Sequence, residues 1–164
     1  MVHTTGPGPS IRTSSNGDSE YRPGMDDADE VLAMRLEKDS LGEREVPVDA
    51  YWGIHTARAL ENFPITRRAI SNYPDLIRGI ARVKQAAARA NREIGVLSAE
   101  KADVIDQVCE ELWNGQWHEQ FVLGAVQGGA GTSTNMCANE VIANRGLEIM
   151  GYEKGDYAHL HPID

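Results

Sequence analysis

The chain has 164 residues, enough for one domain of ordinary size, and 41% of them are hydrophobic, which is enough to form a core. A formal net charge of −9 argues against a general nucleic-acid-binding role, because such a role needs a basic surface. The sequence contains no run apolar and long enough for a transmembrane helix, and the N-terminus lacks the apolar region of a signal peptide. We therefore expect a cytoplasmic protein with no nucleic-acid or membrane partner, whose Cys109 and Cys137 are buried thiols rather than metal ligands.

Residues 1–33 are rich first in Gly, Pro, Ser and Thr and then in acidic residues. Such a segment has too little apolar surface to offset the conformational entropy that it would lose on ordering. We expect a disordered acidic tail here, with the folded domain formed by residues 34–164. Its first element should be a short β-hairpin, because residues 35–38 and 44–47 flank the turn residues Asp39–Gly42.

The first helix is expected over about residues 50–62, with Asp49 as its N-cap and Pro64 after its end. Arg58 in this helix has two interpretations. Its guanidinium could bind a carboxylate ligand, or it could pair with Glu61 three residues further on.

Two further helices are expected over residues 74–94, ended by Gly95, and from Ser98 to about Trp113. Apolar residues of the first recur at spacings of four and three, which predicts a seam buried against other helices: Leu76, Ile80, Val83, Ala87, Ala90 and Ile94. Its arginines lie outside this seam and should form a solvated face, with a membrane-surface helix as the alternative.

The most informative stretch is the glycine-rich segment before the last helix. Gly128–Gly131 lack bulky side chains, and Thr132 or Ser133 is the expected N-cap. Backbone N–H groups and hydroxyls at the positive end of a helix are suited to binding an anion. Asn135 and Asn139 should share one face of this helix. The alternative is a plain turn, since many such loops have no ligand. The segment is neither a P-loop nor a good dinucleotide-binding fingerprint.

This segment, GGAGTSTNMCANEV, resembles the first signature of the aspartase/fumarase superfamily. Its matching residues are Gly131, Thr132, Ser133, Asn135, Met136, Asn139, Glu140 and Val141, while Cys137 departs from the usual Asn. Residues 35–63 are similar to the N-terminal block of the same superfamily. The resemblance implies a mainly α fold, the N-terminal helical domain with a short β-hairpin near its start and without the central helix bundle.

The combination GGAGTS, with Ala130 and Ser133, is more similar to the aspartase branch than to fumarases. The resemblance therefore implies elimination of ammonia from L-aspartate to give fumarate, by anti elimination through an enediolate, with no organic cofactor. No residue is assigned as a metal ligand, and metal activation is left open. Substrate-binding roles are implied for four residues of the glycine segment and, through a T-x-R-A-x-E-N-F motif, for one arginine: Gly131, Thr132, Ser133, Asn135 and Arg58. His161 and Asp164 match a loop that forms a secondary anion site in fumarases, but Ile163 replaces its Asn.

The general base of the family is a serine on a downstream loop that these 164 residues do not contain, so no catalytic residue is assigned within the chain. The resemblance implies the N-terminal part of a lyase that is a homotetramer at full length, and we expect this chain alone to be inactive. Alternatives are a fumarase-type hydratase, an argininosuccinate-type lyase, or a non-catalytic helical domain that binds a partner.

Overall fold

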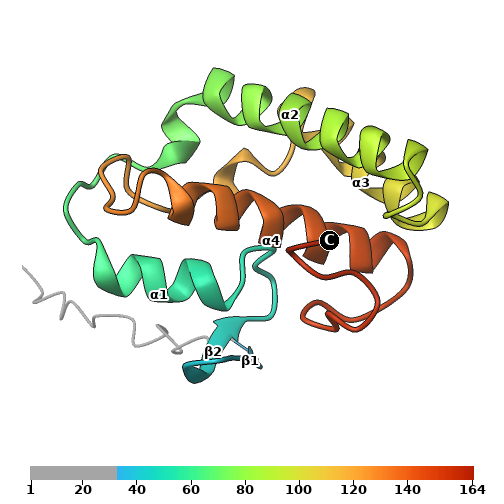
Figure 1. The fold of residues 1–164 in the computed structure, drawn as a ribbon. Coiled ribbons are helices and arrows are strands. Elements are labelled where there is room, and N and C mark those ends of the chain that lie inside the picture. Colours follow the sequence, from blue (N-terminus) through green and yellow to red (C-terminus); the bar gives the residue numbers. More distant parts are fainter. Residues whose placement is uncertain (1–32) are drawn as a thin grey trace, which may run out of the picture. The chain divides into compact units, whose positions relative to one another are not determined.

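The structure, a computed structural model, describes residues 33–164. Its elements are β1 (Met34–Asp39), β2 (Gly42–Pro47), α1 (Ile54–Asn62), the 3-10 turn η1 (Ile70–Asn72), α2 (Pro74–Glu93), α3 (Ala99–Trp113), the 3-10 turn η2 (His118–Gln120) and α4 (Thr132–Ile149). The predicted mainly α fold with a short hairpin near its start is confirmed (Figure 1). The tail predicted for residues 1–33 lies, except for Ala33, outside the described residues. None of the helices between residues 33 and 164 combines the length and apolar character that a membrane span requires.

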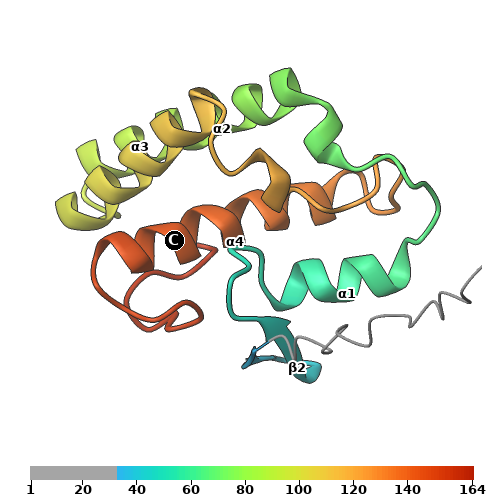
Figure 2. The same cartoon turned by 180° about the vertical axis from the view of Figure 1, so that it is seen from behind.

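Helix α4 is the central element. It lies between α1 on one side and the antiparallel pair α2–α3 on the other, as both views show (Figures 1 and 2). Its buried residues are Cys137, Ala138, Glu140, Val141, Ile142, Ala143, Asn144, Gly146 and Leu147. The largest buried cluster joins this helix to its neighbours, with Ile77 and Ala81 from α2, Val108 and Leu112 from α3, and Phe121 and Leu123 from the following connector.

The hairpin follows the prediction. Asp39 pairs with Gly42, so Ser40 and Leu41 form a two-residue connection. The Asp39 carboxylate accepts a hydrogen bond from the Leu41 N–H at 2.9 Å, which closes the turn. Asp39 also binds Arg58 of α1 through two hydrogen bonds of 2.8 and 2.7 Å, which fasten the hairpin to the helix.

The expected start of α1 is wrong. The helix begins at Ile54, not near Ala50, and its N-cap is Gly53 instead of Asp49. The carbonyl groups of Ala50 and Trp52 accept hydrogen bonds from the Arg35 guanidinium at 2.7 and 2.8 Å, which holds residues 50–52 in a non-helical conformation. The sequence around Asp49 could not indicate this, because Arg35 lies in another element.

The N-terminus of α1 is capped by two buried carboxylates from distant parts of the chain. Glu140 of α4 accepts hydrogen bonds from the N–H groups of Gly53, His55 and Thr56 at 3.0, 2.7 and 3.1 Å, and from the Thr56 hydroxyl at 2.6 Å. Glu37 of β1 accepts from the Ile54 N–H at 2.9 Å. All four N–H groups that a helix start leaves unpaired are therefore satisfied by negative charge, which the helix dipole favours. Burial nevertheless raises the pKa of Glu140 above its usual value.

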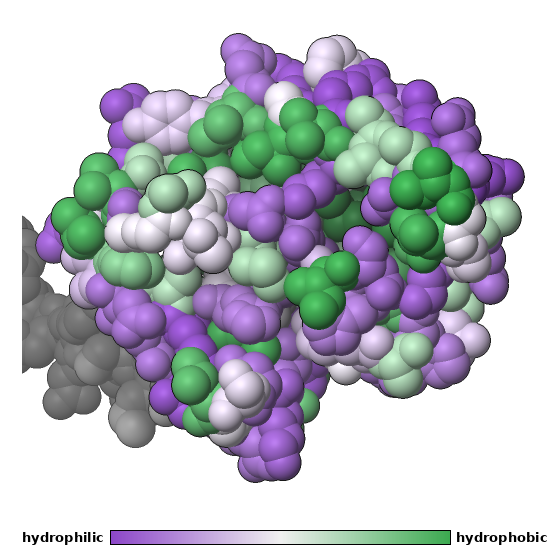
Figure 3. All heavy atoms as spheres, viewed as in Figure 1, coloured by the Kyte–Doolittle hydropathy of each residue, from purple (hydrophilic) through white to green (hydrophobic). Residues whose placement is uncertain are grey.

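The predicted seam of α2 is wrong except at Ile80, which is partly buried and packs against the core. The buried residues of this helix are Ile77, Ala81, Gln85 and Ala88, which lie on a different face of the helix from the predicted seam. In the seam itself, Leu76, Val83 and Ile94 are 47%, 68% and 72% exposed, and apolar side chains gather on the surface over α2 (Figure 3). Small alanines on the buried face let α3 approach closely.

The arginines of α2 are only in part the solvated face that was expected. They remain partly exposed, but three of them pair with acidic residues of α3: Arg82 with Glu110, Arg89 with Asp106, and Arg92 with Asp103. Helix α3 itself follows the prediction, with Ser98 as its N-cap and its end at Trp113. Both cysteines are buried free thiols as predicted, and burial raises the pKa of each to about 12.

Candidate anion-binding site at the start of helix α4

The glycine loop enters α4 through an uncommon backbone conformation. Gly129, Ala130 and Gly131 have φ values of +80°, +53° and +85°, so three consecutive residues are left-handed. Glycine adopts this conformation freely, whereas for an alanine it costs about 1–2 kcal/mol. A strained residue that persists in an exposed loop points to a functional constraint on the backbone.

The expected hydroxyl cap of α4 is wrong. Helix α4 begins at Thr132, its N-cap is Gly131, and no side chain of the N-cap residue closes it. The Thr132 N–H and hydroxyl both donate to the Gly129 carbonyl, at 3.1 and 2.7 Å. The left-handed Gly131 takes the position that we assigned to Thr132 or Ser133, which moves both hydroxyls into the first turn of the helix.

Two side chains that the sequence analysis did not single out support the loop. The Gln127 amide donates to the Gly124 carbonyl at 2.7 Å and accepts from the Thr134 N–H and hydroxyl at 3.1 and 3.0 Å. The ring of Phe63, which ends α1, lies so close to Gly128 that a Cβ there would be 3.0 Å from its Cε1 atom. Neither role has a signal in local sequence patterns, because both depend on how the loop folds back.

Several N–H groups of this loop remain without a partner. Within residues 33–164, the N–H groups of Gly129, Ala130, Gly131 and Ser133 make no hydrogen bond, and the first three residues are exposed. Unpaired donors gathered at the positive end of a helix form an environment suited to a carboxylate or another anion.

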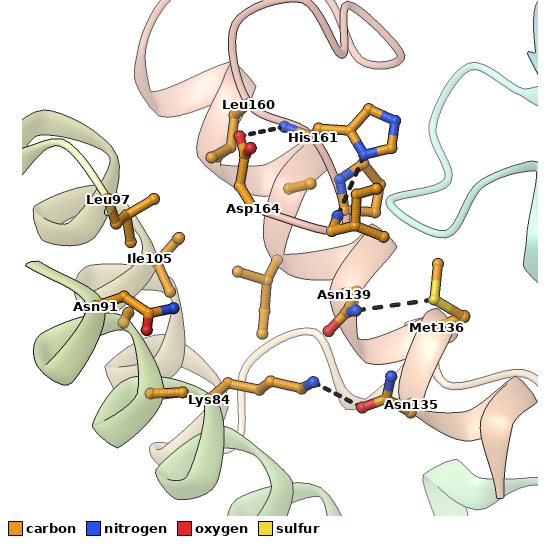
Figure 4. Close-up of a pocket in the computed structure, with 16 residues that line it drawn as sticks. Lys84, Asn91, Leu97, Ile105, Asn135, Met136, Asn139, Leu160, His161 and Asp164 are labelled. Atoms are coloured by element: carbon orange, nitrogen blue, oxygen red, sulfur yellow. Dashed lines mark hydrogen bonds between the residues drawn. The ribbon is translucent and has the colours of Figure 1, made fainter. Parts of the chain in front are cut away.

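A cavity of ≈ 360 Å³ lies between α2, α3, α4 and the last residues of the chain (Figure 4). Asn135, near the start of α4, lines it, whereas residues 128–133 do not. Lys84 of α2 reaches across and donates to the Asn135 side-chain oxygen at 2.6 Å. Burial lowers the pKa of Lys84. Asn139, one turn further along α4, faces the same cavity, where its amide contacts the Met136 sulfur at 3.8 Å.

The last four residues line the opposite wall of the cavity. The Asp164 carboxylate accepts from the His161 N–H at 2.9 Å and from Lys101 at 2.5 Å. The structure thus brings His161 and Asp164 to the same cavity as Asn135, while the carboxylate of Asp164 is already occupied by the protein's own donors.

Arg58 makes its hydrogen bonds to the β-hairpin and not to the residues that line the cavity. It pairs with Asp39 rather than with Glu61, and it also donates to the Gly42 carbonyl at 3.1 Å. The Arg58 hydrogen bonds hold the pKa of Asp39 down at about 2. In the described part of the chain, no three His, Cys, Asp or Glu side chains are grouped closely enough to hold a metal ion.

Comparisons with known proteins agree in placing the chain among lyases. A family model described as "Lyase" matches residues 42–163. Over 132 residues the chain is 57% identical to an aspartate ammonia-lyase of Pseudomonas fluorescens and 52% identical to that of Escherichia coli K12, covering 80% of this chain and 28% of each relative. The chain therefore spans less than a third of the length of these relatives.

Solved structures agree with this result. A fumarate lyase:delta crystallin from Brucella melitensis in native form has a TM-score of 0.79 at 51% identity, covering 80% of this chain and 31% of that one. A class II fumarase from Schistosoma mansoni has a TM-score of 0.69 at 34% identity, covering 75% and 26%. Because the family model covers most of the chain, the chain belongs to this lyase family, the aspartase/fumarase superfamily that its two sequence segments predicted.

Proposed function

We propose that this chain is part of an aspartate ammonia-lyase, which converts L-aspartate to fumarate and ammonia. The observation that carries the proposal is the 52–57% identity to relatives of that name across 132 residues that include the glycine loop. The unpaired N–H groups at the start of α4 support it, because both aspartate and fumarate are dicarboxylates that such donors can bind.

The reaction removes a proton from the carbon next to one carboxylate and then breaks the C–N bond. Negative charge accumulates on the oxygens of that carboxylate, which becomes a dianionic enediolate before ammonia leaves. Donors already aimed at those oxygens lower the barrier, because they need no reorganisation as the charge develops. We assign this role to the N–H groups of Gly131 and Ser133, the Thr132 hydroxyl and the Asn135 amide.

Thr132 can take this role only after a rearrangement. Its hydroxyl proton is used in the bond to the Gly129 carbonyl, so it must rotate away from that carbonyl to donate to a ligand. Lys84 already occupies the Asn135 oxygen, which leaves the Asn135 NH₂ group as the donor available to a carboxylate.

The general base and the remaining carboxylate contacts are proposed to come from outside these 164 residues. The complete protein is proposed to be a homotetramer that acts without an organic cofactor, and the isolated chain is proposed to release no ammonia. Arg58 contributes to the site in this proposal only indirectly, because its guanidinium is engaged by Asp39.

A chimera tests the proposal. The 132 matched residues of the Pseudomonas fluorescens relative are exchanged for the corresponding residues of this chain, and ammonia release from L-aspartate is measured. We expect activity within about tenfold of the parent enzyme. An assembled chimera that releases no ammonia would overturn the proposal.

A fumarase-type hydratase is the second candidate, favoured by the 34% identity to the class II fumarase. The same exchange made in that fumarase, assayed with fumarate and malate, tests it. Restored hydration there together with a silent aspartase chimera would favour the hydratase.

A further inference from the structure

The side chain of Gln127 connects the two ends of the glycine loop. Its Nε2 donates to the Gly124 carbonyl before the loop, and its Oε1 accepts from both the N–H and the hydroxyl of Thr134 in the first turn of α4. One amide thus makes three hydrogen bonds across ten residues of chain. We propose that Gln127 is a positioning residue, which holds the loop so that its backbone N–H groups face outward.

The loop needs such support because little else holds it. Gly128–Gly131 have no side chain larger than a methyl group, and a loop of this kind is free to adopt many other conformations. Ala130 in particular is disfavoured in its left-handed state. Besides Gln127, the loop is held by the Thr132 bonds to Gly129, by the Asn135 N–H bond to the Gly131 carbonyl at 3.0 Å, and by the ring of Phe63 against Gly128.

Gln127 also determines which N–H groups of the helix start remain free. By accepting from the Thr134 N–H it satisfies the third N–H of α4, whereas the Ser133 N–H, one residue earlier, has no partner within residues 33–164. It does so with a neutral group. A carboxylate at the same place could still accept from Thr134, but it could not donate to the Gly124 carbonyl and would repel an anionic ligand.

The inference rests on the proposed function for the identity of the ligand, but the position of the loop can be measured without one. The experiment uses the 164-residue chain with Gln127→Ala and Gln127→Glu. Gln120→Ala is the matched control. The Gln120 side-chain oxygen accepts from the Tyr51 N–H at 2.8 Å, and within the described residues this side chain makes no hydrogen bond to the glycine loop. The readouts are amide hydrogen exchange and the scalar coupling that reports φ of Ala130.

In Gln127→Ala we expect the Thr134 amide to exchange about three- to tenfold faster, which is the effect of one lost hydrogen bond. We also expect the scalar coupling of Ala130 to change, because its φ no longer stays positive. Gln127→Glu should keep Thr134 protected but weaken fumarate binding about two- to fivefold, because it adds a negative charge at the helix start and loses the bond to the Gly124 carbonyl. Gln120→Ala should change the Tyr51 amide and leave Ala130 unchanged.

An unchanged Ala130 coupling and Thr134 exchange rate in Gln127→Ala would overturn the inference. Equal fumarate binding by the wild type and both Gln127 variants would also count against it, while leaving the proposed function standing. A third outcome separates the two proposals. If the loop is released in Gln127→Ala, and the loop amides of the wild-type chain do not respond to fumarate, the result supports the inference and counts against the proposed function.

Discussion

Helices α1 and α4 both begin at an N-cap glycine, but the two starts differ in what meets their N–H groups. At α1, the carboxylates of Glu37 and Glu140 accept from all four N–H groups of residues 53–56. At α4, the first turn contains no acidic residue, and within the described residues the N–H groups of Gly131 and Ser133 have no partner. The fold therefore satisfies the N–H groups of one helix start with its own carboxylates and leaves N–H groups of the other without an acceptor from the described residues.

The two glycines are required for different reasons. Gly53 has extended backbone angles that any residue adopts, but an added Cβ would lie 2.6 Å from the Tyr157 hydroxyl and 2.7 Å from a Glu37 oxygen. Gly131 has open space around it, but its φ of +85° disfavours any residue with a Cβ. Crowding by the capping groups explains the first glycine, and backbone conformation explains the second.

The largest expected effect on stability comes from Glu140→Ala, which removes the cap at the N-terminus of α1. It leaves three N–H groups and the Thr56 hydroxyl without their buried acceptor, so we expect a loss of about 3–5 kcal/mol in the free energy of unfolding. Chemical denaturation measures this loss. Glu119→Ala, at an exposed position, is the control and should change stability by less than about 0.5 kcal/mol. A Glu140 variant as stable as that control would show that water can replace the carboxylate.

At the start of α4, Thr132→Val in the aspartase chimera is the corresponding change. Valine keeps the shape of threonine and removes the hydroxyl, so turnover should fall roughly tenfold to a thousandfold if that hydroxyl stabilises the developing charge. Steady-state kinetics on the assembled chimera measure the effect, and Thr66→Val, outside the glycine segment, serves as the control. Unchanged turnover would restrict Thr132 to closing the loop on Gly129.

Substitution of the two N-cap glycines by alanine should give smaller losses of stability that differ between the two helix starts. Gly53→Ala should destabilise the chain by about 2–3 kcal/mol, since the new methyl group displaces the capping carboxylates. Gly131→Ala should cost only about 1–2 kcal/mol, the price of a left-handed alanine. Thermal unfolding of the two variants side by side measures both. A larger loss for Gly131→Ala would reverse our assignment of the two constraints.

The smallest expected effect is direct binding of an anion. Fumarate added to the 164-residue chain should shift the amide resonances of residues 129–133 with millimolar affinity, because only part of the site is present. The amides of residues 53–56 should not respond, since carboxylates of the protein already occupy them. Equal shifts at both helix starts would mean that the difference between them does not govern binding.

Local signals in the sequence were sufficient for several elements. The hairpin turn at Asp39–Gly42, the Ser98 cap of α3 and the Pro74 start of α2 are each specified by residues within four positions of the feature. These are short-range hydrogen bonds or steric limits, so the folded structure keeps them.

The errors came from partners that lie far away in the sequence. The start of α1 is set by Arg35 and by Glu140, which is 84–87 residues from the groups that it caps. The buried face of α2 contains two small alanines and Gln85, whose side chain bonds to Glu110 of α3, and a count of large apolar residues does not weigh these. In the site, Thr132, Ser133 and Asn135 could be named from the motif, but the contribution of Gln127 depends on how the loop folds back.

Helix α4 has a consequence for the exchange of segments between related proteins. Thr132 at its first turn and Glu140 in its middle are eight residues apart, about 12 Å along one rigid helix. Inserting or deleting a single residue between them would turn Glu140 by about 100° around the axis relative to the glycine loop. Either the glycine loop or the Glu140 cap on α1 would then no longer be correctly positioned. We therefore expect the number of residues between positions 132 and 140 to be invariant in functional relatives, even where the residues themselves differ.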